Sequence, residues 1–240
     1  MTRILNGNTE STRGQVGQGI YSLADLRLYL AYYGGKQADG EPALHWLSHV
    51  LNPVAHRPRH PDYSFSDLIS LFVVRELLRL GVRPSRIREA ELYMRMRFGT
   101  DRPFVSEEVA TDGESVFVRS DVPEQVETAT QSGGQQVSRV VVTRYLGGQQ
   151  VSRVVVARYL KNVGYHRGEA VFWSPIDHVW LNPKVQFGEP VVADTRILTS
   201  TAAETTERYG ASEAVARLAI PVSAARSALR FERRLAALRD

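Results

Sequence analysis

The chain has 240 residues, a formal net charge of +4 and no cysteine, and 43% of its residues are hydrophobic. This length and apolar fraction are enough for one large domain or two modest ones. The absence of cysteine excludes disulfide bonds and thiolate metal sites. No apolar run approaches the roughly 18 to 20 residues of a membrane helix, and no signal sequence is recognisable, so we expect a cytoplasmic protein with no membrane partner.

Charge is unevenly distributed along the chain. Residues 75–102 contain eight Arg against four acidic residues, whereas residues 103–132 contain seven acidic residues and a single Arg. Only three of the 30 basic residues are Lys. This preference for Arg fits phosphate recognition, but it fits a GC-rich genome equally well.

The N-terminal region predicts a disordered arm followed by two helices. Residues 1–18 are polar and contain almost no apolar side chains. Ser22 can cap a helix that runs to Tyr33 and ends at Gly34-Gly35. A second helix is expected after Pro42, with Leu44, Trp46 and Leu47 as buried residues.

A basic segment and two further helices follow. Residues 56–61 (HRPRHP) cannot be helical because of their prolines, so they predict an exposed loop or wing. Ser64 and Asp67 have capping-box spacing, which predicts a helix to about Leu80 that stops at Gly81. Pro84 opens the next helix, whose predicted buried stripe is Ile87, Ala90, Met94 and Phe98, with Arg88 and Arg95 outside it.

The middle of the chain, residues 111–165, predicts a linker that carries a tandem duplication. Asp112-Gly113 indicates a tight turn before a short strand, and the acidic, Ser/Thr/Gln-rich stretch to Ser132 is typical of a linker. Residues 133–146 and 147–160 are copies of one unit that differ only at Thr143 and Ala157. Their valine runs fit a β-hairpin, and their spacing also fits two short helices, so the pattern leaves both open.

The C-terminal region, residues 166–240, predicts two short strands and then three helices. The strands are residues 170–173 and 178–181, each broken by a following proline. Ser200 or Thr201 can cap the first helix, Gly210 breaks it, and Ile220-Pro221 separates the last two, as a helix-turn-helix requires. The last helix carries a predicted buried stripe of Ala224, Ala228, Phe231, Leu235 and Leu238. On another face it carries the basic residues Arg226, Arg230, Arg233 and Arg234.

Residues 21–98 resemble the DNA-binding domain of the MerR family, with two helices, a basic wing and two more helices. The resemblance is carried by SLADL at 22–26, LHWL at 44–47, residues 59–63 and the helix from Phe65 to Leu80. It implies a MerR-like DNA-binding domain over residues 19–110, in which residues 43–49 enter the major groove. The DNA-binding residues it implies are His45, His49, Arg57, Arg59 and Tyr63.

The last 65 residues resemble a small module catalogued as a domain of unknown function. The matching strings are residues 179–183, FGEPVV at 187–192, TRI at 195–197 and YGAS at 209–212. Proteins that join this module to a MerR-like front half are similar to VapB-type antitoxins, whose partners are PIN-domain ribonucleases. The resemblance implies an autorepressing, homodimeric antitoxin that binds operator DNA and a VapC-type toxin.

The expected fold class is therefore mainly α with small β elements (α+β), a MerR-like winged helix-turn-helix plus a C-terminal helix-turn-helix-like module. The Arg226, Arg230, Arg233 and Arg234 face can bind DNA phosphates or the acidic site of the toxin, and we favour the toxin. A stand-alone MerR-like transcriptional regulator is the alternative function, and a scaffold that binds only protein is a third.

No catalytic, metal or cofactor site is expected. His45 and His49 have the spacing of two zinc ligands, but neither Cys nor a suitably placed carboxylate completes the set. Asp177-His178 belongs to no serine triad, because the chain lacks a Gly-x-Ser-x-Gly elbow. Neither a phosphate-binding glycine loop nor a periodic cluster of acidic residues occurs, so we expect a binding protein and not an enzyme.

Overall fold

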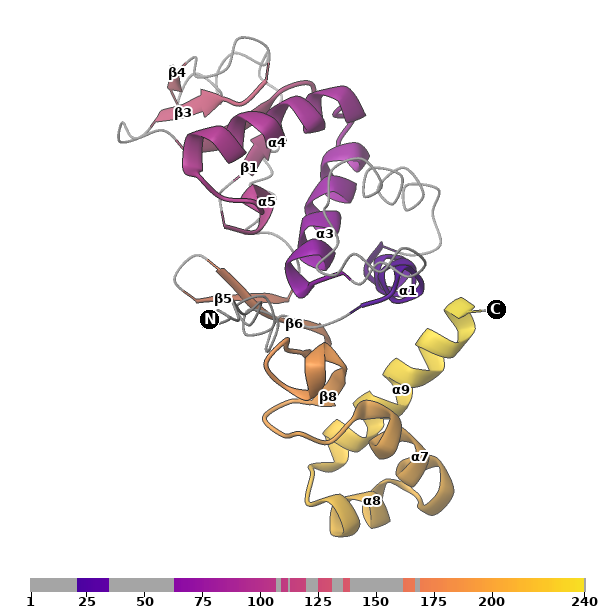
Figure 1. Cartoon of the computed structure of the whole chain (residues 1–240). Helices are drawn as coiled ribbons and strands as arrows, with labels where there is room; N and C mark the ends of the chain where they lie inside the picture. Colours follow the sequence, from indigo (N-terminus) through magenta and orange to yellow (C-terminus); the bar gives the residue numbers. More distant parts are fainter. Residues whose placement is uncertain are drawn as a thin grey trace, which may run out of the picture.

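The computed structural model describes residues 21–34, 63–106, 109–111, 113–119, 125–130, 136–138, 162–166 and 169–239. In these residues the fold is α+β, with helices and two separate four-stranded antiparallel sheets. The first sheet and the helices around it form one end of the molecule, and the three C-terminal helices form the other (Figure 1). The predicted second helix, residues 43–49, and the basic loop, residues 56–61, lie outside the described residues.

Two capped helices build the N-terminal part. Helix α1 (Leu23–Gly34) begins with the predicted cap, in which Ser22 Oγ accepts from the Asp25 backbone N–H and the Asp25 carboxylate accepts from the Ser22 N–H. Helix α3 (Phe65–Arg79) has the predicted capping box of Ser64 and Asp67. These helices start where predicted because a cap depends on residues only three apart.

Helix α3 is surrounded on most sides, with eleven of its fifteen residues buried. Helix α4 (Pro84–Phe98) begins at its proline as predicted and ends at Gly99 in the left-handed conformation. Its stripe of Ile87, Ala90 and Met94 is fully buried, and Phe98 is partly buried. The short helix α5 (Pro103–Ser106) follows, and the adjacent Arg102 forms a 2.7 Å ion pair with buried Asp67.

The first sheet occupies part of the predicted linker. Strands β1 (Val109–Thr111), β2 (Val116–Arg119), β3 (Gln125–Thr128) and β4 (Gln136–Ser138) pair in this order. The turn between β1 and β2 is where Asp112-Gly113 predicts it. The predicted short strand is confirmed as β2. The linker interpretation is wrong for β3 and β4, because pairing with neighbouring strands overrides a polar composition. Strand β4 takes three residues of the first duplicated unit, while both valine runs lie outside the described residues.

The second sheet consists of β5 (Val163–His166), β6 (Glu169–Ile176), β7 (Val179–Leu181) and β8 (Pro190–Val192). Strand β6 contains the first predicted strand, and β7 matches the second except at His178, which lies in the turn before it. The expectation that Pro175 breaks the first of them is wrong: β6 continues through it to Ile176, with an irregular register between Trp173 and Ile176 that accommodates the proline. A short 3-10 helix, η1 (Gln186–Gly188), connects β7 to β8.

Three helices end the chain. They are α7 (Thr199–Tyr209), α8 (Ala211–Leu218) and α9 (Val222–Arg239), and their breaks at Gly210 and residues 219–221 are those predicted. The predicted cap of α7 is wrong, because its N-cap is Leu198 and makes no side-chain cap bond. The helices share a small core of apolar residues with β8, consisting of Val192, Ala202, Ala214, Ile220, Ala224, Ala225 and Ala228.

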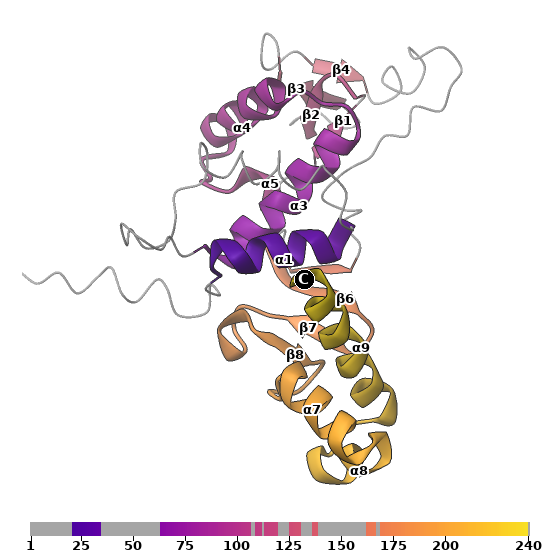
Figure 2. The same ribbon diagram turned by 90° about the vertical axis from the view of Figure 1, so that its right-hand side faces the viewer.

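A larger core joins the N-terminal and C-terminal parts. Trp173 of β6 is 1% exposed, and its ring centroid lies 6.0 Å from Tyr29 of α1 and 4.8 Å from Phe72 of α3. Phe231 of α9 lies 5.0 Å from Tyr32 of α1. Figure 2 shows the C-terminal end of α9 beside α1. No helix among the described residues is long and apolar enough to cross a membrane.

Candidate functional site

Helix α9 presents the predicted basic face on its outer side. Its alanine-rich sequence has high helix propensity, and the residues that anchor it are Ala224, Ala228, Phe231 and Leu235, all at most 3% exposed. Leu238, also predicted to be buried, is partly buried. The four predicted partner-binding arginines are all exposed. Because the buried stripe holds α9 against the core, it also fixes the backbone positions from which these arginine side chains extend.

Two of the four arginines contact groups on other helices. Arg233 Nη2 lies 3.0 Å from Glu207 Oε1 of α7. Arg234 Nη2 donates to the Tyr32 backbone oxygen at 3.0 Å, and its guanidinium lies 4.2 Å from the centre of the Tyr32 ring. Burial raises the pKa of Tyr32, which the charge and hydrogen bond of Arg234 oppose. Arg234 therefore has a structural role in holding α9 against α1.

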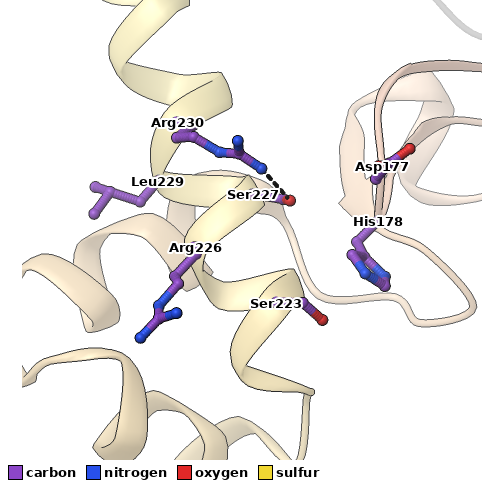
Figure 3. A pocket seen from close by; sticks show the side chains of 7 residues that line it. All are labelled: Asp177, His178, Ser223, Arg226, Ser227, Leu229 and Arg230. Atoms are coloured by element: carbon purple, nitrogen blue, oxygen red, sulfur yellow. Dashed lines mark hydrogen bonds between the residues drawn. The ribbon is translucent and has the colours of Figure 1, made fainter.

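The other two arginines line an open hollow of about 540 Å³ between α9 and the turn that connects β6 to β7. Arg230 extends towards this turn, and its Nη2 donates to Ser227 Oγ at 3.2 Å, whereas Arg226 extends away from the turn along α9 (Figure 3). Among the described residues, the lining consists of Asp177, His178, Ser223, Arg226, Ser227, Leu229 and Arg230. Guanidinium, hydroxyl and imidazole groups are hydrogen-bond donors, so this set of side chains can bind an anion.

The far wall of the hollow is a two-residue turn in an unusual conformation. Ile176 pairs with Val179, so Asp177 and His178 form the whole connection between the strands. His178 has a φ of 66°, in the left-handed region where His, Asn and Asp are enriched among residues other than Gly. This conformation is consistent with a tight two-residue connection between antiparallel strands.

Five residues of the hollow, including Leu229, are not among the site residues predicted from the sequence. The sequence singles out Asp177-His178 only as a pair that completes no catalytic triad, and it gives Ser223 and Ser227 no binding role. Two features of the sequence could have identified them. One is the two-residue connection between the strands, and the other is the pair of serines, some fifty residues later, on the same helix as the arginines. Only the tertiary packing of the sheet against α9 brings these segments together. Among the described residues, no cluster of His, Asp and Glu is suited to a metal ion.

The predicted DNA-binding residues are only partly described. His45, His49, Arg57 and Arg59 lie outside the described residues. Tyr63 is 7% exposed, and its backbone N–H and C=O pair with those of Tyr21 at 2.8 and 2.9 Å. Burial raises the pKa of Tyr63, and the charge of Asp67 raises it further. Its position is therefore explained by packing at the start of α3, with little side-chain surface left for a phosphate.

The sequence matches no family model and no curated protein. Among solved structures, the chain is similar to Rv2018 from Mycobacterium tuberculosis, known from an X-ray crystal structure, with a TM-score of 0.53 at 15% sequence identity. The similarity covers 87% of this chain and 96% of that chain. At this identity the likeness shows a shared fold and nothing about function.

Proposed function

We propose that this chain is the antitoxin of a type II toxin–antitoxin system. In this proposal it neutralises a PIN-domain ribonuclease through its C-terminal helices and, as a homodimer in the cytoplasm, represses its own operon. The observation that carries the proposal is the exposed pair Arg226 and Arg230 beside an open hollow on a helix that the core holds in place. The sequence resemblances of both halves support it.

The proposed neutralisation depends on charge complementarity. Guanidinium groups form charge-assisted, often bidentate, hydrogen bonds with carboxylates. A PIN-domain ribonuclease holds its metal ion with carboxylates, so an arginine placed there competes with the metal ion and with the RNA backbone. A rigid helix lowers the entropic cost of placing that arginine, because fewer rotatable bonds are ordered on binding.

The test of neutralisation is co-expression of the full chain with the product of the adjacent gene, which under this proposal is a PIN-domain ribonuclease. We expect the two to purify as one complex and the ribonuclease to be inhibited in it. The full chain is required because Phe231 and Trp173 pack on α1 and α3, so a C-terminal fragment would expose that surface. If the chain binds its operator but no PIN-domain protein, it is the stand-alone regulator.

The proposed operator binding rests on residues 43–49, Arg57 and Arg59. Arginine contacts to phosphates release counterions, which makes the affinity dependent on salt. We expect the Arg57→Ala/Arg59→Ala variant to bind all DNA sequences more weakly and to reduce the salt slope by roughly one to two units. A gel-shift titration over several salt concentrations measures both. A variant that matches the wild type at every concentration would remove this loop from the interface.

A further inference from the structure

The hollow between α9 and the β6–β7 turn is lined by two arginines and one acidic residue, Asp177. In the described part of the chain, neither Arg226 nor Arg230 forms an ion pair with a carboxylate, whereas Arg233 is paired with Glu207. Asp177 lines the same hollow, but in the described part of the chain it forms no ion pair with Arg226 or Arg230. The four arginines that the sequence treats as one basic face therefore divide into two, Arg226 and Arg230, that line the hollow, and two, Arg233 and Arg234, that contact other helices.

The shape of the site favours a protruding side chain over a nucleic-acid backbone. The site is concave, Leu229 gives it an apolar part, and Asp177 places a negative charge in its lining. Asp177 repels a row of phosphates more strongly than a single carboxylate, and a duplex backbone does not enter a hollow of this size. A single carboxylate on a short side chain can reach Arg230, whose guanidinium extends towards the β6–β7 turn (Figure 3).

We infer that this hollow is the docking site for an aspartate or glutamate side chain of a protein partner. Arg230 pairs with the entering carboxylate, Arg226 contributes charge at the rim, and Ser223 and His178 provide hydrogen bonds. This inference rests on the proposed function, because it takes the partner to be a protein. It extends that function by naming the carboxylate as the group that is recognised. It also excludes Arg233 and Arg234 from the recognition.

The site is organised before the partner arrives. Ser227 is 1% exposed and accepts a hydrogen bond from Arg230, which orients the guanidinium towards the β6–β7 turn (Figure 3). The two-residue turn leaves His178 little freedom. Such preorganisation strengthens binding by lowering the ordering cost, and it makes the position of one arginine matter more than the total charge.

The test uses the full chain and a fluorescently labelled hexaglutamate peptide, with hexaglutamine as the uncharged control. Anisotropy titrations compare the wild type with four variants: Arg230→Ala, Arg226→Ala/Arg230→Ala, Arg233→Ala and, as a matched charge control on α7, Arg208→Ala. Arg208 is exposed and pairs only weakly, at 3.4 Å, with Glu204. Circular dichroism verifies that each variant is folded.

We expect Arg230→Ala to weaken peptide binding about tenfold or more and the double variant to weaken it further. Arg233→Ala and Arg208→Ala should change it by less than about twofold. Equal losses for Arg230→Ala and Arg233→Ala would overturn the inference in favour of a diffuse basic face. Absence of peptide binding to the wild type at low salt would also overturn it, as would displacement of the peptide from these residues by a short DNA duplex.

The same variants separate this inference from the proposed function. If the peptide binds through Arg230 but the adjacent PIN-domain protein does not, the hollow recognises carboxylates and the antitoxin proposal fails. If the PIN-domain protein binds and the double variant binds it as tightly as the wild type, the antitoxin proposal stands and the hollow is not its site.

Discussion

At the scale of single residues, the most informative side chains are charged groups within the core. Arg75 is 2% exposed and donates to the backbone oxygens of Leu30 at 2.7 Å and Gly34 at 2.8 Å. It thereby satisfies carbonyl groups at the C-terminal end of α1 from α3. A Cβ at Gly34 would lie only 1.5 Å from the Arg75 guanidinium, so this glycine is required by its neighbour.

Glu91 is the second such group, and it predicts a dependence of stability on pH. It is 1% exposed and pairs with Arg95 at 2.8 Å. Burial raises its pKa from 4.5 to about 7, although Arg95, Arg102 and Arg88 act in the opposite direction. The folded protein therefore holds this proton more tightly than the unfolded chain does, so the contribution of Glu91 to stability is present at low pH and is lost as the pH rises.

We predict that the free energy of unfolding of the wild type, relative to that of Glu91→Gln, falls by about 2 to 3 kcal/mol between pH 4.5 and about pH 7. Urea denaturation of both proteins across this range measures the difference. Comparison with the glutamine variant cancels the other titrating groups. Parallel profiles would show that Glu91 has the same pKa in the folded and unfolded states.

At the scale of elements, the duplicated segment contributes a strand to the first sheet. Strand β4 consists of residues 136–138 and pairs with β3 through Val126 and Val137. The second unit contains the same three residues, Gln150-Val151-Ser152. Either unit therefore contains a strand that is able to complete the sheet.

We predict that deletion of residues 147–160 or of residues 133–146 leaves a folded protein whose Tm changes by less than about 4 °C. Deletion of both units, residues 133–160, is the control, and it should lower the Tm further because no copy of β4 remains. Thermal melting followed by circular dichroism measures all three. A large loss from either single deletion would show that the two units have different roles.

At the scale of the whole molecule, the two predicted domains are not separate. Their contact is the aromatic cluster in which Trp173 packs against Tyr29, Tyr32, Tyr33 and Phe72. The binding face of α9 is connected to the N-terminal part through the same core, because Phe231 packs on Tyr32. A ligand on one part can therefore affect the stability of the other.

We predict that the protein unfolds in a single cooperative transition and that Trp173→Ala lowers its free energy of unfolding by about 3 to 5 kcal/mol, through loss of buried aromatic surface. Differential scanning calorimetry tests both statements. Trp173→Phe, which retains an aromatic ring, should cost less. Two separate transitions in the wild type would show that the shared core does not couple the two parts.

The sequence by itself determined the longer helices and most of their ends, but neither the N-cap of α7 nor the short helix α5. Ser64 and Asp67, Pro84, Gly81 and Gly210 act through atoms a few residues away, so their effect can be read locally. The same holds for the buried stripe of α9, whose 3.6-residue period is a property of the helix. The α+β class and the turn before β2 follow from such local signals.

Tertiary structure alone decided which segments meet. Strands β3, β4, β5 and β8 have no clear local signal, because a strand is stabilised by partners that the sequence does not identify. The burial of Arg75 and Glu91 depends on groups from other helices. The division of the basic face has the same cause: Arg233 and Arg234 find Glu207 and Tyr32 only after folding, and Arg230 meets the β6–β7 turn because the sheet packs beside α9.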